Sequence, residues 1–567
     1  MSTATVTIAS GATWEEVAAD RQKHRDNTLV SLNPPPPKLL TNDIPLDTTR
    51  IPKTLLTPSD LEITESNVED LTSKLASGHW SAKTVVQAFL GRAAIAQQLT
   101  NCVTELLPEY ALKRAAELDE YLATTGKPVG PLHGVPISVK EHIGIEGQDL
   151  NAAFVGWVGR VAEKDALILQ ILRDAGAVFF VRTTQPQTLM QIETVNNLYG
   201  TTTNPHNTTL TSGGSSGGEG ALLGIRGSVL GIGTDIGGSI RCPAGNSGVF
   251  GFKPTALRLP VSGGSATMLS SDHIVATIGP LSTSLAGVLL FIRTIIDARP
   301  WLREPSLVPI PWKDEVQLAE EEEKKKERKL RVGVIWDDGV VKPHPPVVAA
   351  LSNVVEKLRQ SGDIEVVEWK PWKHDLAWEI ISKLYFCDGG AEELAAVQAS
   401  GEPLTPLAKW ILLENPHVRE HTIPTLWEAL QERDAYRTSY AAIWNERDVD
   451  VILCPVGPGV APKHGTSRYW CYTSQWNLLN YPAIVFPTGI KVGREGDDAH
   501  AHEYPSDYKP VSQADEYNYG LWKEHGAEGG YTGAPVSLQL VGRMYEDEKL
   551  LRALDRLLDT AGLAKTC

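Results

Sequence analysis

The sequence has little cysteine and methionine and no long run of apolar residues. Its 6 cysteines lie far apart and form no CxxC pair, which argues against a structural zinc site and favours reduced, buried thiols. No stretch approaches the roughly 18 consecutive apolar residues of a membrane-spanning helix. The opening residues, MSTATVTIASGATWEE, lack the basic region and apolar core of a secretory signal. We therefore expect a cytoplasmic protein with no integral membrane span.

The chain also has fewer basic than acidic residues. The chain has 53 lysines and arginines against 69 aspartates and glutamates, a formal net charge of −16. Proteins that bind nucleic acid normally carry a basic patch, so we expect no nucleic-acid partner. The hydrophobic content of 42% and the charged content of 22% are those of an ordinary globular protein. With 567 residues there is ample chain to bury a large core.

Alternating strand and helix patterns indicate the fold class. An apolar strand that ends in Lys140 is followed by an apolar helix, which we expect Asp165 to cap, and by a second apolar strand. Strand, helix and strand at this spacing form a βαβ unit of a parallel sheet. A second such unit follows later, so we predict an α/β protein with one large sheet covered by helices. The predicted elements are 132–140, 166–175 and 177–181, then 330–336, 347–360 and 364–369.

The domain organisation is predicted from composition. Residues 1–55 contain a run of four prolines from residue 34, which favours polyproline II and cannot continue a helix. We expect this segment to be an extended N-terminal arm. Residues 56–567 are predicted to form a single domain with its catalytic core at 130–255, and the polar segment 491–530 is predicted to be a surface excursion.

A glycine- and serine-rich stretch, residues 212–251, is the most distinctive part of the chain. It contains two Gly-Gly-Ser units, which end at Ser215 and Ser239. Glycine is used where a backbone turns tightly or approaches another group, and the amides of such turns can bind a phosphate or a developing oxyanion. The predicted elements are a loop at 211–217, a helix at 218–226, a strand at 229–234, a loop at 235–238 and a helix from 239.

Phosphate, dinucleotide and metal sites fit the sequence poorly. A phosphate-binding loop would need a lysine where Glu219 stands. A dinucleotide fingerprint would need its third glycine one residue before Gly237. The sequence DDAHAH at 497–502 has zinc-binding residue types, but its loop-like setting favours ordinary surface polarity. We therefore expect no cofactor and no metal.

Nucleophilic serine chemistry remains, and two arrangements compete. GGSSG at 213–217 matches a nucleophile elbow at Ser215, with His273 and His464 downstream. An elbow follows an apolar strand, whereas the residues before Ser215 are polar. Alternatively, a neutral lysine can activate a serine. Lys140 ends a buried strand, where desolvation lowers a lysine pKa, although a salt bridge or a snorkelling side chain is the ordinary role there.

The sequence resembles the amidase-signature hydrolases. The resemblance is carried by PLHGVPISVKE at 131–141, SGGSSGGEGALLGIRGS at 212–228 and GTDIGGSIRCPAGNSGVFGFKPT at 233–255. It covers nearly the whole chain and looks closest to the fungal acetamidases and the related fatty-acid amide hydrolases. It implies a large mixed sheet with helices on both faces, and an enzyme that cleaves a carboxamide C–N bond.

The resemblance also implies catalytic roles. Lys140, Ser215 and Ser239 would form a Ser-cis-Ser-Lys triad, in which Ser215 shuttles protons and Ser239 carries the acyl group. The backbone amides of Ile236, Gly237, Gly238 and Ser239 would form the oxyanion hole.

Supporting and substrate residues follow from the same resemblance. Asp235 and Arg241 would brace the nucleophile loop, and Ser216 would either orient Lys140 or cap the next helix. The expected substrate contacts are Thr211, Ser212, Gly213, Gly214, Trp470 and Tyr472, with packing in the core as the alternative role of the tryptophan.

The substrate is open at this point. A small or specialised-metabolite amide is preferred, and a fatty-acid or aryl amide hydrolase with esterase side activity is an alternative. An amidotransferase subunit that delivers ammonia to a partner and a non-catalytic binding protein are the rival functions. Relatives are often dimers, so the resemblance implies a homodimer.

Overall fold

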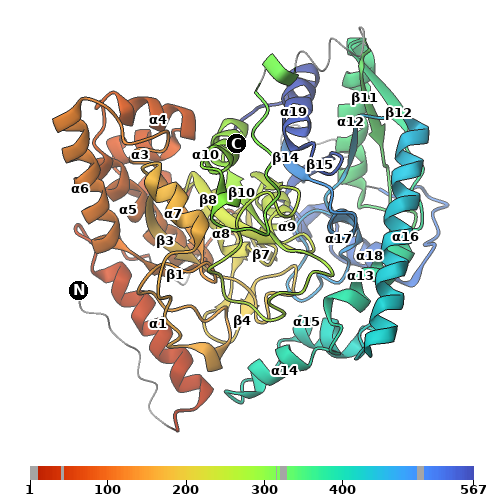
Figure 1. Cartoon of the computed structure of the whole chain (residues 1–567), viewed down its shortest axis with the longest axis horizontal. Coiled ribbons are helices and arrows are strands. Elements are labelled where there is room, and N and C mark those ends of the chain that lie inside the picture. The colour runs from red at the N-terminus through yellow and green to blue at the C-terminus, as the bar shows by residue number, and fades with distance from the viewer. Residues whose placement is uncertain (1–10, 40–43, 315, 319–327, 495–502) are drawn as a thin grey trace.

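The computed structural model describes residues 11–39, 44–314, 316–318, 328–494 and 503–567 (Figure 1). Within these residues, eleven strands form one mixed sheet in the order β1-β3-β2-β8-β10-β9-β14-β15-β13-β11-β12. The strands are β1 Val103–Leu106, β2 Pro136–Lys140, β3 Val178–Thr183, β8 Leu230–Asp235, β9 Phe250–Lys253, β10 Thr277–Ser282, β11 Leu330–Val334, β12 Ile364–Glu368, β13 Val451–Pro455, β14 Ala483–Lys491 and β15 Pro535–Val541.

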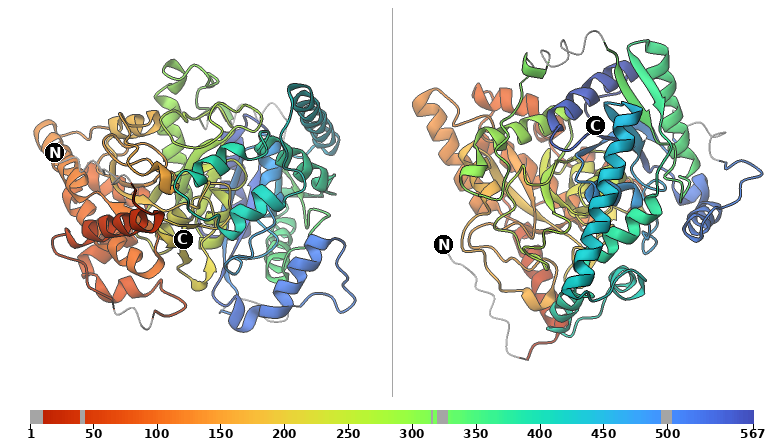
Figure 2. Two further views of the ribbon diagram at one scale, coloured as in Figure 1. Left: turned by 90° about the horizontal axis from the view of Figure 1, so that it is seen from below. Right: turned by 45° about the vertical axis from the view of Figure 1, so that its right-hand side comes forward.

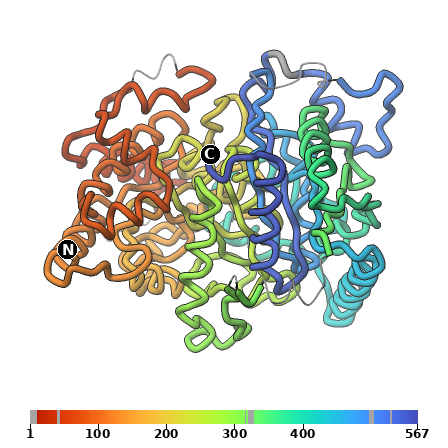
Figure 3. The backbone as a smooth tube through the Cα atoms, turned by 90° about the horizontal axis from the view of Figure 1, so that it is seen from above, coloured from red at the N-terminus to blue at the C-terminus, as the bar shows by residue number. Residues whose placement is uncertain are grey.

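The sheet joins two halves of the chain. Its first six strands come from the part before residue 283 and its last five from the part after residue 329. Figures 2 and 3 show the red to yellow-green half beside the green-to-blue half. The halves join where β9 pairs with β14. Two short hairpins stand apart from this sheet: β4 Val195–Asn196 with β5 Gly200–Thr201, and β6 Thr203–Asn204 with β7 Asn207–Thr211.

Helices cover both faces of the sheet (Figures 1 and 2), which confirms the predicted fold class. In the first half they are α1 Trp14–Val30, α2 Ile51–Leu55, α3 Pro58–Glu65, α4 Val68–Ala76, α5 Ala82–Thr100, α6 Pro108–Thr125, α7 Leu167–Asp174, α8 Gly217–Gly224, α9 Arg241–Ser247 and α10 Leu285–Asp297. In the second half they are α12 Pro345–Ser361, α13 His374–Tyr385, α14 Ala391–Gln398, α15 Pro406–Lys409, α16 Ile423–Arg447, α17 Cys471–Leu478, α18 Gln513–His525 and α19 Asp547–Ala561. Short turns of other helix types are η2 Val155–Trp157, η3 Pro300–Leu302, η4 Trp410–Glu414 and η6 Gly526–Gly530.

Both predicted βαβ units are present. Strands β2 and β3 are parallel neighbours joined through α7, and β11 and β12 are parallel neighbours joined through α12. Every residue of β2 and β3 is buried, as expected of strands covered on both faces. The expected cap of α7 is wrong: Ala166 is the N-cap residue, and Asp165 Oδ1 instead accepts the N–H of Glu146 at 2.8 Å.

The predicted extended arm is wrong for much of its length, because it contains the helices α1 and α2. Helix α1 begins at a capping box, in which Thr13 Oγ1 accepts the N–H of Glu16 and the Glu16 carboxylate accepts the N–H of Thr13. This helix lies against β1. The proline run that suggested an extended arm begins at residue 34, after α1 has ended.

Two further expectations concern the polar segment 491–530 and the absence of a membrane span. The segment 491–530 includes helix α18, and its residues 495–502, with the DDAHAH sequence, lie outside the described residues. Among the described residues, no helix is long and apolar enough to cross a membrane.

Candidate active site

Lys140 lies at the end of β2 and is completely buried. Strand β2 is parallel to β8, with Ser138 opposite Gly231 and Val139 opposite Ile232. This register brings the ends of both strands to one edge of the sheet. There the Lys140 Nζ atom lies 2.7 Å from Ser215 Oγ and 2.9 Å from Thr234 Oγ1.

The Lys140 amine has the electrostatic character of a base. Burial lowers its pKa to about 7, and the negative charges of Asp235 and Glu219 partly oppose that shift. A large fraction of the amine is therefore neutral at neutral pH, and a neutral amine can accept a proton.

Glycine turns bring Ser215 and Ser239 together. Gly213 has φ of 88°, and a Cβ atom there would lie 2.8 Å from the backbone of Pro243. A Cβ atom on Gly214 would lie 2.6 Å from the carbonyl oxygen of Gln191. Only glycine fits at these two positions, because any side chain would clash with the neighbouring backbone. The N–H of Ser216 donates to the carbonyl of Ser239 at 3.0 Å, which ties the two turns together.

Asp235 and Arg241 form a fully buried ion pair at 3.0 Å. Burial alone would raise the pKa of Asp235, but the guanidinium of Arg241 outweighs it and holds that pKa well below its usual range. The Asp235 carboxylate also accepts the N–H groups of Gly238 and Ile240 at 2.9 and 3.1 Å. These contacts fix the turn that carries Ser239.

This bracing changes the expected oxyanion hole. The N–H of Gly238 is engaged by Asp235 and is therefore not available to an oxyanion. The N–H groups of Ile236, Gly237 and Ser239 have no acceptor among the described residues. The hydroxyl of Tyr385 donates to the Ile236 carbonyl at 2.7 Å, and because a trans peptide points its N–H away from its carbonyl, this contact directs the Gly237 N–H to the opposite side.

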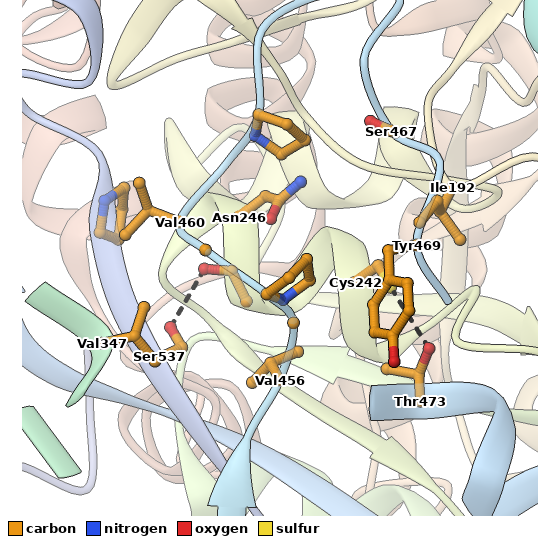
Figure 4. A pocket seen from close by; sticks show the side chains of 16 residues that line it. Ile192, Cys242, Asn246, Val347, Val456, Val460, Ser467, Tyr469, Thr473 and Ser537 are labelled. Atoms are coloured by element: carbon orange, nitrogen blue, oxygen red, sulfur yellow. Dashed lines mark hydrogen bonds between the residues drawn. The ribbon is translucent and has the colours of Figure 1, made fainter. Parts of the chain in front are cut away.

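A cavity of about 50 Å³ lies beside α9, the helix that follows the turn carrying Ser239, and its lining includes none of Lys140, Ser215 and Ser239 (Figure 4). It has room for roughly four water-sized groups. Cys242 and Asn246, one helical turn apart on α9, form part of its wall, and Tyr469 and Thr473 lie beside Cys242. The remaining side chains are mostly small or aliphatic, among them Ile192, Val347, Val456, Val460, Ser467 and Ser537.

Trp470 and Tyr472, which were expected to contact substrate, do not line this cavity. The Tyr472 hydroxyl donates to the Val341 carbonyl at 2.6 Å and so points into the core. Trp470 packs against the nucleophile turn itself, where a Cβ atom on Gly237 would lie 3.2 Å from its ring. Their neighbours Tyr469 and Thr473 line the cavity instead.

The remaining expected residues surround Ser215. Ser216 is the N-cap residue of α8, but its side chain makes no capping hydrogen bond. Its Oγ instead accepts the N–H of Thr234 at 3.3 Å. Thr211 Oγ1 accepts the N–H of Gly213 at 3.0 Å. Ser212 is fully buried, and its hydroxyl has no partner among the described residues.

The elbow interpretation finds no support in the contacts of Ser215. The basic group that touches its Oγ is Lys140, whereas His464 Nδ1 lies 2.9 Å from the carboxylate of Glu193. No group of residues suited to hold a metal ion occurs in the described part of the chain.

No role was predicted for Thr234, His142, Tyr385 and Thr473. Thr234 contacts Lys140, His142 contacts Thr234, and Tyr385 and Thr473 contact the nucleophile turn. Thr473 Oγ1 donates to the Gly237 carbonyl at 2.7 Å. Thr234 could have been found, because it directly precedes Asp235 in the motif GTDIGGS. Tyr385 and Thr473 come from distant helices, and no local signal marks them.

Comparisons with known proteins agree with this geometry. The family model described as Amidase matches residues 84–551. A relative from Schizosaccharomyces pombe, "Putative amidase C550.07", is 44% identical over 548 residues, which is 96% of this chain and 99% of the relative. An acetamidase of Emericella nidulans is 37% identical over 549 residues, which is 95% of this chain and 96% of that protein.

A solved structure of a fatty acid amide hydrolase has the same fold, with a TM-score of 0.89 at 34% sequence identity. The match covers 97% of this chain and 95% of that one. The chain therefore belongs to the amidase-signature family and is an amide-hydrolysing enzyme.

Proposed function

We propose that this enzyme hydrolyses a carboxamide through an acyl-enzyme on Ser239. The contact between Lys140 Nζ and Ser215 Oγ carries the proposal. Neutral Lys140 accepts the proton of Ser215, Ser215 takes the proton of Ser239, and Ser239 Oγ attacks the carbonyl carbon. The amides of Ile236, Gly237 and Ser239 receive the negative oxygen, and one such donor is worth about 10²–10³ in rate.

The same relay then works in reverse. An amine is a poor leaving group unless it gains a proton, so Ser215, reprotonated by Lys140, delivers one to the departing nitrogen as the C–N bond breaks. A water molecule next loses its proton to the relay and attacks the acyl carbon on Ser239, which frees the carboxylic acid.

We propose a small amide as the substrate. The cavity beside Cys242, at about 50 Å³ and with mostly small or aliphatic walls, supports a short acyl or amine group. The likeness to an acetamidase points the same way. The likeness to a fatty acid amide hydrolase favours the second candidate, a long-chain or aryl amide.

A panel of amides, from acetamide to long-chain and aryl amides, tests both parts, with release of ammonia or amine as the readout. We expect the highest kcat/KM for short amides and no turnover by Ser239→Ala. A preference for long-chain amides would overturn the substrate class, and turnover by Ser239→Ala would overturn the mechanism. An amidotransferase subunit would instead need a partner protein for full turnover.

Three organisational features are part of the proposal. They are a single domain from residue 56 to residue 567, a cytoplasmic location and a homodimer. Sedimentation of the purified chain tests the last of them.

A further inference from the structure

A line of hydrogen bonds leads from Lys140 away from Ser215. Lys140 Nζ lies 2.9 Å from Thr234 Oγ1, which lies 2.9 Å from His142 Nε2. The other ring nitrogen, Nδ1, lies 2.9 Å from the carbonyl oxygen of Ser265. The relay described above uses neither Thr234 nor His142, although the imidazole of His142 is buried and the half-buried Thr234 contacts the base.

The partners of His142 determine where its proton lies. A carbonyl oxygen can only accept, so Nδ1 carries the proton and donates to Ser265. Burial is the main cause that lowers the pKa of His142 to about 3, and the positive charge of Arg182 adds to it, so the ring is neutral. Its Nε2 atom is therefore a lone-pair acceptor.

The neutral ring fixes the direction of the next two bonds. Because Nε2 can only accept, the single hydroxyl proton of Thr234 is donated to His142. Thr234 Oγ1 can then only accept from Lys140, which must give it an N–H. A neutral amine has two N–H groups and one lone pair, so an N–H given to Thr234 leaves the lone pair free to accept from the hydroxyl of Ser215, the other contact of Nζ.

We propose that His142 is a positioning residue: by holding the proton of Thr234, it keeps the lone pair of Lys140 free to accept from Ser215. Without this acceptor, the Thr234 hydroxyl would turn its proton to the strongest neighbouring base, which is the lone pair of Lys140. Lys140 would then offer Ser215 an N–H, and the relay could not accept the serine proton. This inference rests on the proposed acyl-enzyme mechanism.

His142→Leu tests the inference, because leucine removes the acceptor and keeps an apolar volume. We expect kcat for a short amide to fall by about tenfold or more while KM stays within about twofold, since a positioned base contributes to the chemical step. Labelling of Ser239 by a fluorophosphonate should slow in parallel. His142→Gln, whose amide oxygen can accept from Thr234, should recover part of both rates.

A double-mutant cycle separates positioning from mere packing. In a Thr234→Val background the intermediary is gone, so adding His142→Leu should change kcat by less than about twofold. The inference is overturned if His142→Leu alone keeps kcat within about twofold of wild type, or if its full loss persists in the Thr234→Val background.

If His142→Leu does not fold, Thr234→Val and the matched control Thr234→Ser carry the test. The Thr234→Ser variant keeps the hydroxyl and its kcat should stay near that of the wild type, whereas kcat of Thr234→Val should fall. Equal kcat values for the two variants would overturn the inference.

Failure of the mechanism itself can be distinguished from failure of this inference. A wild-type enzyme that is not labelled at Ser239 contradicts the acyl-enzyme, whereas equal labelling rates in wild type and His142→Leu contradict only the role of His142.

Discussion

The amine nitrogen of Lys140 lies 2.7 Å from the hydroxyl oxygen of Ser215, although 75 residues separate them in sequence. Strand β2 carries the lysine, and the glycine turn before α8 carries the serine. Lys140 is fully buried and Ser215 is 2% exposed. Bulk water therefore does not compete for this contact, and the same burial weakens the hold of Lys140 on its proton.

We expect kcat/KM to rise with pH, and the midpoint of this rise, the acid limb of the pH–rate profile, to lie near pH 7. Burial lowers the pKa of Lys140 to about 7; below that pH the amine is charged and cannot accept the proton of Ser215, and above it the amine is neutral. We expect kcat/KM to fall about tenfold per pH unit on the acid side. Lys140→Arg should be inactive at every pH, because a guanidinium keeps its proton. A rate that peaks near pH 5 would contradict this account.

Removal of the Glu219 charge should move that limb to lower pH. The Glu219 carboxylate is buried, accepts hydroxyl protons from Ser138 and Thr183 at 2.5 and 2.7 Å, and raises the pKa of Lys140 by its negative charge. Glu219→Gln removes that charge, so the lysine loses its proton more readily. The shift should be modest, because burial raises the pKa of Glu219 itself to about 7.

The matched control for this shift is Glu402→Gln. Glu402 is also buried and hydrogen-bonded, to Gln187 and Asn197, but its charge does not act on Lys140. The acid limb of the pH–rate profile of Glu402→Gln should lie at the same pH as that of the wild type. Identical limbs for Glu219→Gln and wild type would show that Glu219 does not influence the base.

Loss of Arg241 should destabilise the fold strongly. Arg241→Met leaves the fully buried Asp235 carboxylate without its cation, which typically costs about 3–5 kcal/mol in the free energy of unfolding. Urea unfolding measures the loss. The exposed pair Arg293 and Asp297, 3.4 Å apart, is the control, and Arg293→Met should cost less than about 1 kcal/mol. Similar costs for both variants would refute the bracing role.

Filling the cavity should narrow the substrate range. Cys242→Phe places a ring where the wall encloses about 50 Å³, whereas Cys242→Ser keeps the size of the side chain. The phenylalanine variant should lose kcat/KM more steeply as the amide grows larger, and the serine variant should follow the wild-type order. An equal loss on every amide would mean that the cavity does not hold substrate.

Local patterns predicted the large elements well. The buried strands β2 and β3 and the helix α7 follow from continuous apolar runs bounded by glycine and proline. Helix α1 was missed, although Thr13 and Glu16 stand at capping-box spacing. The proline run beyond it has a stronger local signal and dominated the interpretation of the whole arm.

The site could be predicted in part. Lys140 and Ser215 were expected together and lie in contact. The Gly238 amide was misassigned because its partner, Asp235, depends on how the turn folds back. Tyr472 was expected to contact substrate, but its hydroxyl donates to the Val341 carbonyl, and Thr473, the next residue of α17, lines the cavity. The bond between Thr234 and His142 joins segments 92 residues apart and leaves no trace in local sequence.

The most direct test of the central claim is the site of covalent capture. The purified enzyme is treated with a fluorophosphonate, and its proteolytic peptides are analysed by mass spectrometry, with Ser239→Ala and Ser215→Ala treated in parallel. The account predicts an adduct on Ser239 in wild type, no adduct in Ser239→Ala, and slowed labelling of Ser239 in Ser215→Ala. An adduct on Ser215, with Ser239 unmodified, would contradict it.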